Sequence, residues 1–395
     1  MTSGLNPESP TRAAAGAPVL ALGFRLFYLL AGAYGAVSIA VWALQFSGRL
    51  PGAALVQGPL WHAHEMLFGY TFAVIAGFLF TAVKNWTQRP TPTGAPLAIL
   101  GALWVAARVL SFTPWRPWSA LPDLLFTLGV AIGIARPLLA SANKRNYLFI
   151  ALVIVIGAAN LAFEAAISGW ADYPPQRALW AAADVVLLVI SIVAGRVVPM
   201  FTNNAIEGAG ARRMQSVEYA ALGTVIALAL ADVAGAAMTA GVIAAFAAIA
   251  HAVRLALWSP LATRRTPLLW ILHASYAWLV VHLALRALAA LDVASASLAM
   301  HALAVGGIGG MTLGMMTRSA LGHSGRPLKA GAAEIASYAF VQLAAIARVL
   351  VPLLVPAAYL ASVAAAGVMW FTAFAVFTAT YWPILTRPRI DGRPG

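Results

Sequence analysis

Long apolar stretches separated by short polar ones recur along the whole sequence. Most of them reach about 20 residues, the length that an α-helix needs to cross the hydrocarbon core of a bilayer. The short alternating segments of a membrane β-barrel do not occur. The chain is therefore predicted to be an all-α, polytopic integral membrane protein. We expect about twelve membrane-spanning helices, at residues 21–46, 62–84, 95–112, 117–139, 147–169, 177–200, 217–237, 238–257, 267–290, 294–317, 333–353 and 358–385.

The predicted spans leave little of the chain for any other domain. Residues 1–18 are rich in Pro, Ala, Gly and Ser and lack the apolar core of a signal peptide, so we expect a disordered cytoplasmic tail. Residues 19–386 are predicted to form a single transmembrane helical domain, and residues 387–395 a short basic tail. We recognise no internal repeat and no soluble domain.

Composition and charge refine this prediction. The chain of 395 residues is 62% hydrophobic and 9% charged, whereas a soluble domain carries about 25% charged residues. Eighteen of the 25 Lys and Arg residues fall on the side that holds both termini, and six on the other. The positive-inside rule therefore puts both termini in the cytoplasm and requires an even number of spans. We attribute the net charge of +13 to topology and anionic lipid, and expect no nucleic-acid binding.

The seven histidines fall into two layers of the predicted bilayer. The outer layer holds His62, His64 and His301, with His282 in the outer half of its span, and the inner layer holds His251, His273 and His323. Ionisable residues at membrane depth usually mark function, and histidine is a frequent ligand of haem and copper. The chain has no cysteine, which excludes disulfides and thiolate-held haem or iron–sulfur clusters. Taken singly, each histidine is explained more simply as an interfacial hydrogen-bonding residue.

The segment WHAHEMLFGY places two histidines and a glutamate at the mouth of the second span. On a regular helix His62 and His64 point about 200° apart and address two different centres. If the helix begins at His64, both histidines can reach one metal ion. Glu65 either orients a histidine through its second nitrogen or is a solvated charge in the first helical turn.

Several arginines lie near the predicted span ends. Arg25 and Arg196 either snorkel to the inner headgroups or pair with a carboxylate or a haem propionate. Arg318 and Arg326 flank His323 and either follow the positive-inside rule or hold propionates or another anion. The sequence contains no Walker motif and no dinucleotide fingerprint.

The segments GFRLFY, HAHEMLFGY, GRVVPMFT, HAVRLALW, PLLWILHASYAW and HALAVGGIGGMTLGMMTRSALGHSGRPL occur in the order found in the NnrS family, which the chain resembles from about Gly23 to Leu328. Members of that family are multi-span proteins of the bacterial inner membrane that contain haem and copper and are linked to denitrification and resistance to nitric oxide. The resemblance implies that the motif arginine Arg254 is a further anion contact. It implies six metal or haem ligands, His62, His64, His251, His273, His301 and His323, and gives His282, which lies outside the motifs, less weight.

Three functions agree with these observations. The first is a haem and copper protein that binds or removes nitric oxide under nitrosative stress, either as a nitric-oxide-reducing oxidoreductase or without turnover. It would use a b-type haem, copper and electrons from quinol or another donor. The alternatives are a transporter for a metal or small molecule and a haem-based sensor or assembly factor. The first function predicts that His301 approaches His62 or His64 near the outer face, while the three inner histidines gather near the inner face.

Overall fold

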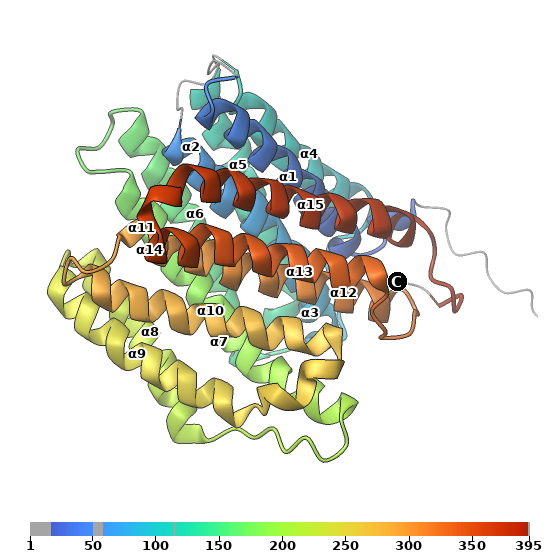
Figure 1. Cartoon of the computed structure of the whole chain (residues 1–395). Coiled ribbons are helices and arrows are strands. Elements are labelled where there is room, and N and C mark those ends of the chain that lie inside the picture. Colours follow the sequence, from blue (N-terminus) through green and yellow to red (C-terminus); the bar gives the residue numbers. More distant parts are fainter. Residues whose placement is uncertain (1–16, 50–57, 114, 394–395) are drawn as a thin grey trace, which may run out of the picture.

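The computed structural model describes residues 17–49, 58–113 and 115–393, and within these ranges the chain forms helices and no strand (Figure 1). The predicted all-α class is therefore confirmed. Residues 1–16 of the tail predicted to be disordered lie outside the described residues.

In the described part of the chain, twelve helical segments cross the bundle. Nine are single α-helices: α1 (Gly23–Phe46), α4 (Gly94–Leu110), α5 (Ala120–Ala140), α6 (Leu148–Ile167), α7 (Gln176–Ala205), α8 (Gln215–Val233), α9 (Ala237–Leu257), α10 (Pro267–Ala289) and α15 (Tyr359–Thr386). Three are compound and contain a π-helical turn: α2 (Pro59–His64), η2 (Glu65–Thr71) and α3 (Phe72–Thr87); α11 (Ala296–His301), η6 (Ala302–Gly309) and α12 (Gly310–His323); α13 (Ala332–Ala345), η7 (Ile346–Leu350) and α14 (Val351–Leu354). Each of the twelve matches one predicted span.

Length and composition support a membrane location for this bundle. Among the described residues, eleven of the segments are long and apolar enough to cross a membrane, and α4, with 17 residues, is a shorter apolar helix. A helix rises about 1.5 Å per residue, so α4 is only slightly shorter than the hydrocarbon core is thick. The protein is thus a multi-pass membrane protein.

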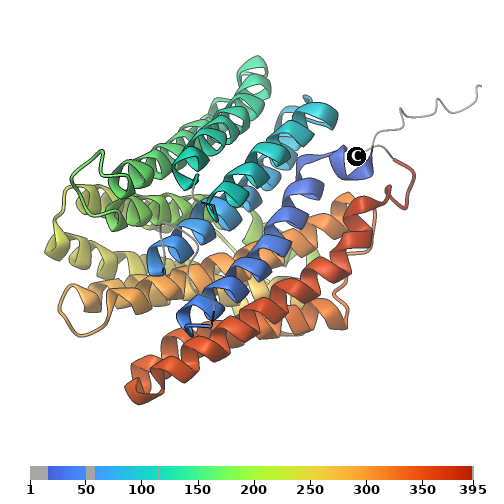
Figure 2. The same cartoon turned by 90° about the horizontal axis from the view of Figure 1, so that it is seen from above.

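Both ends of the described chain lie at the same end of the bundle. Helix α15 packs along α1 and α13, and the red and blue ribbons run side by side in Figures 1 and 2. Arg25, in the first turn of α1, donates hydrogen bonds to the carbonyls of Leu385 (3.2 Å) and Arg387 (2.8 Å) at the end of α15. We call this the inner end, following the charge prediction, and the opposite end the outer end.

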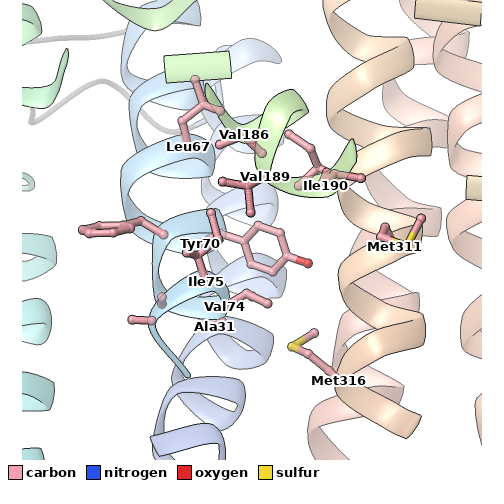
Figure 3. Close-up of a cluster of buried hydrophobic side chains, with 14 of the residues drawn as sticks. Ala31, Leu67, Tyr70, Val74, Ile75, Val186, Val189, Ile190, Met311 and Met316 are labelled. Carbon is pink, nitrogen blue, oxygen red and sulfur yellow. The ribbon is translucent and has the colours of Figure 1, made fainter. Parts of the chain in front are cut away.

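Apolar side chains fill the centre of the bundle. Figure 3 shows Tyr70 of η2 and Val189 of α7 directed toward the region where Met311 and Met316 of α12 lie. Glycines let neighbouring helices approach closely in this core. Gly306, Gly310 and Gly314 follow one another at four-residue spacing along η6 and α12. A Cβ at Gly306 would lie 2.1 Å from the Trp278 ring, so these glycines allow close packing against α10.

Candidate functional site

A cavity of about 640 Å³ lies at the outer end, between α1, α2, α7, α11 and α15. Its walls are mostly apolar and include the indole rings of Trp42 and Trp370. Two histidines and one arginine also line it: His62, His301 and Arg348. Cofactor and ligand sites commonly have this volume and this mixture of apolar walls and a few polar groups.

Each of these three residues lies at or beside a π-helical turn. Segment η2 begins three residues after His62, η6 begins directly after His301, and η7 contains Arg348. They are the π-helical segments of the described chain. A π-turn inserts a residue into the helix and redirects the side chains around it, and such turns occur frequently at functional sites.

The His62 ring packs between two other rings. Its centroid is 5.1 Å from the Trp42 ring, with 12° between the planes, and 6.4 Å from the His301 ring, with 16° between the planes. The buried Nδ1 atom of His62 has no hydrogen-bond partner within the described ranges. The predicted approach of His301 to one histidine of the second span is therefore confirmed, and that histidine is His62.

The tautomer of His301 follows from its contacts. Its Nδ1 atom lies 2.7 Å from the carbonyl oxygen of Ser297, one turn earlier on α11. A carbonyl oxygen only accepts, so Nδ1 carries the proton and Nε2 keeps its lone pair. Histidines that bind metals usually hold their second nitrogen in this way.

Arg348 completes the cavity and is a residue that the sequence patterns did not single out. Its side chain is almost fully buried and packs over the ring of Tyr359 at 5.5 Å. One guanidinium nitrogen, Nη2, donates to Ser297 Oγ at 3.3 Å, while Nη1 is buried and unpartnered in the part of the chain that is described. The available signal was its position on the arginine-poor side, deep within an apolar span.

The residues of this cavity fit a haem. The 6.4 Å between the two imidazole centroids leaves room for one metal ion, because each metal–nitrogen bond is about 2 Å long. His62 and His301 would hold the haem iron, and Arg348 would offer a cation to the haem carboxylates. Within the described residues no three His, Cys, Asp or Glu side chains form a group that could hold a metal ion. Copper would therefore depend on the softer thioethers of Met66 and Met300, which also line the cavity.

His64 points away from this cavity, as the predicted 200° rotation requires. Its Nδ1 atom is 2.9 Å from Glu65 Oε1, and its Nε2 atom is 2.8 Å from Asn160 Oδ1 and 3.4 Å from Glu164 Oε1. Both ring nitrogens face oxygen acceptors, so this arrangement leaves neither of them for a metal ion. His64 and His62 therefore do not reach one centre.

His64 and Glu65 belong to a group of buried charged and polar side chains between α1, α2, α4, α5 and α6. We call this group the outer ionic network. Glu65 is fully buried, so its interpretation as a solvated charge is wrong, and it does orient a histidine, namely His64. Its Oε2 atom accepts a hydrogen bond from Arg108 Nη1 at 3.0 Å. The other members of the network are Tyr34, Asp123, Asn160, Glu164 and Arg116.

At the inner end, His251 belongs to a second buried network. Its Nδ1 atom lies 2.7 Å from the hydroxyl of Tyr276, and its Nε2 atom lies 3.2 Å from the carbonyl of Ala221. Arg254 donates from Nε to Glu218 at 2.9 Å and from Nη1 to the Tyr276 hydroxyl at 2.9 Å. The sequence thus located a buried histidine and arginine, and the structure gives both of them protein partners.

The other two inner histidines have different neighbours. His273 holds its Nδ1 atom 3.0 Å from the carbonyl of Leu269, and the His323 ring lies 5.6 Å from the Phe24 ring. No three-residue metal group, of these histidines or of others, occurs among the described residues. The expectation that His251, His273 and His323 gather near the inner face stays a prediction.

Most of the arginines singled out in the sequence are also bound by the protein. Arg196 donates to Asn146 Oδ1 at 2.7 Å, and Arg318 lies 4.0 Å from the centre of the Phe201 ring. Arg326 alone of this set retains a buried Nη1 atom for which the described residues offer no partner. None of these arginines lines the histidine cavity.

Comparison with known proteins agrees with the sequence and the fold. No curated protein matches this chain. The family model described as NnrS protein matches residues 18–389, which is nearly the whole chain. The matched range contains all twelve described helical segments. The chain therefore belongs to the NnrS family.

Proposed function

We propose that this protein is a membrane haem protein that binds and removes nitric oxide at the outer histidine cavity. The cavity carries the proposal, because it brings His62, His301 and Arg348 together within one apolar volume. Family membership supports the same function. Nitric oxide is small and weakly polar, so it can reach such a cavity through the bilayer.

The side chains have distinct roles in this proposal. His62 and His301 would hold a b-type haem, and Arg348 would pair with its carboxylates. Ser297 positions two of these groups, since its carbonyl fixes the tautomer of His301 and its hydroxyl accepts from Arg348. When bound, the haem would supply one-electron chemistry, and its iron would take nitric oxide in place of one of the two histidines. Copper would bind at Met66 and Met300 beside the same histidines.

We place the protein in the inner membrane of a bacterium, with both termini in the cytoplasm, because the basic residues favour that side. Turnover of nitric oxide would make it an oxidoreductase. Its electrons would come from quinol or another donor in the membrane.

The test is the reduced-minus-oxidised visible spectrum of the purified protein, with and without nitric oxide. We expect a b-type haem signal that shifts when nitric oxide is added. His62→Ala and His301→Ala should each abolish or strongly reduce the signal, and Arg348→Gln should lower haem retention. His273→Ala is the matched control, since it removes a buried histidine outside the cavity.

Two outcomes contradict the proposal. A haem signal that survives in both His62→Ala and His301→Ala moves the haem to another site. A folded wild-type protein that retains no haem or copper after synthesis in haem-replete cells favours the transporter, and metal uptake into vesicles would then be measured.

A further inference from the structure

A second cavity, of about 540 Å³, adjoins the first at the outer end of the bundle. Most of its wall consists of alanine and glycine from α6, α7, α9 and α10. Asp232 and Arg286 provide charged groups on one side. Trp180 and Ala296 line both cavities, so the first two turns of α7 form part of the wall between them.

Two carboxyl groups share one arginine at this wall. Arg286 of α10 donates from Nη1 to Asp184 Oδ1 at 2.9 Å and from Nη2 to Asp232 Oδ2. The two carboxyl groups are therefore held side by side by the two terminal nitrogens of one guanidinium group. The guanidinium group stacks on the Trp180 ring at 4.9 Å, which ties the group to the wall between the cavities.

The two carboxyl groups differ in their access to water. Asp184 is 2% exposed, and its Oδ2 atom has no donor among the described residues. The Asp232 side chain is 18% exposed and lines the second cavity. An unpartnered buried carboxylate oxygen is costly, whereas a protonated carboxyl group becomes a donor to its neighbour.

The local charges also require a proton. One guanidinium group faces two adjacent carboxyl groups, and a single proton shared between them relieves the repulsion of two like charges in a medium of low dielectric constant. The other ionisable groups nearby are Arg177 and Tyr173, which line the same cavity, and His282, one turn before Arg286 on α10. His282 holds its Nδ1 atom 2.7 Å from the carbonyl of Ala299. None of these three forms an ion pair with either aspartate in the described chain.

We propose that Asp184 and Asp232 share one exchangeable proton and form a proton-transfer site between the outer aqueous phase and the histidine cavity. Asp232 takes the proton from hydronium in the second cavity and leaves water. The proton then passes along the carboxyl–carboxylate hydrogen bond to Asp184 as one O–H bond breaks and another forms. Arg286 remains charged throughout and keeps the two groups in contact.

The use of this proton in the histidine cavity rests on the proposed function. Reduction of nitric oxide to nitrous oxide and water consumes one proton for each electron, and the second cavity shares Trp180 and Ala296 with the histidine cavity. The shared proton itself depends only on Asp184, Asp232 and Arg286.

The experiment measures the infrared carbonyl band of protonated carboxyl groups in the purified protein, in H₂O and in D₂O. We expect the wild type to show a band that shifts in D₂O. Asp184→Asn and Asp232→Asn should each lower the intensity of this band by the contribution of one protonated carboxyl group, because either change leaves a single carboxylate balanced by Arg286. Asp172→Asn, in an exposed loop position, is the control and should leave the band unchanged.

A band that keeps its full wild-type intensity in either variant overturns the shared proton. Carbodiimide labelling of the wild type provides a second measurement that needs no variant, since this reagent modifies protonated carboxyl groups in apolar surroundings. We expect the label on Asp184 or Asp232, and labelling of neither overturns the proposal. If wild-type protein consumes no nitric oxide, the proposed function fails while the infrared result still decides the proton site.

Discussion

Removal of the central cation of the outer ionic network should strongly destabilise the protein. Arg108 is 3% exposed and binds Glu65 at 3.0 Å and also Asp123. Arg108→Met keeps the volume of the side chain but leaves two buried carboxylates without this cation. Breaking a buried ion pair by removing one partner costs about 3–5 kcal/mol, so we expect a loss of that size in the free energy of unfolding.

Equilibrium unfolding in mixed detergent micelles, followed by circular dichroism, measures this loss. Arg49→Met is the matched control, because Arg49 is exposed at the outer end of α1, and we expect a change within about 0.5 kcal/mol. The variant that combines Arg108→Met with Glu65→Gln and Asp123→Asn should recover more than half of the loss, since no unpaired carboxylate remains at these positions. A loss below about 1 kcal/mol for Arg108→Met would refute the view that these charges stabilise one another.

Two other predictions concern single positions. In Gly69→Ala the new Cβ would lie 2.8 Å from Arg108 Nη1. We therefore expect a lower unfolding temperature and a loss of about 1–3 kcal/mol in the free energy of unfolding. Gly223→Ala, where no neighbouring atom lies within 4 Å of the new Cβ, is the control and should be neutral or stabilising. At the inner end, the Arg389 guanidinium lowers the pKa of Asp391, so their ion pair persists as the pH falls through the ordinary carboxylate range and is lost only below the lowered pKa. The NMR titration midpoint of the Asp391 carboxyl group should move up to about 4 in Arg389→Gln, and an unchanged midpoint would contradict this cause.

The fold was predictable because a bilayer leaves few choices to the backbone. Every backbone polar group inside the hydrocarbon must be satisfied, so apolar stretches of sufficient length become helices. This constraint operates on α4 as well, although its 17 residues make it the shortest continuous crossing helix. The distribution of Lys and Arg required an even number of spans, and the contact between Arg25 and the end of α15 agrees with that requirement.

The depth of the histidines in the bilayer was predictable from the sequence, but the direction in which each one points around its helix was only partly predictable. A 100° rotation per residue separated His62 from His64 because both lie on one helix. No comparable rule relates residues on different helices, so the predicted gathering of the inner histidines had no geometric basis beyond a common depth. The π-turn beside His301 also lies outside this rule, since a single sequence pattern does not distinguish a π-helix from an α-helix.

The spacing of His62 and His64 gains a physical meaning from their surroundings. His64 is fixed by oxygen atoms on both ring nitrogens, and Glu65 beside it is fixed by Arg108. These contacts hold the short helix α2 in one rotational position, and the helical rotation then directs His62 into the cavity. Loss of the His64 contacts would therefore reach the cavity through the orientation of α2, without any bond between His64 and a metal ion. In the spectral test, His64→Gln should retain haem with a perturbed spectrum, whereas His62→Ala should lose it. Complete loss of haem from a stably folded His64→Gln variant would instead make His64 a ligand.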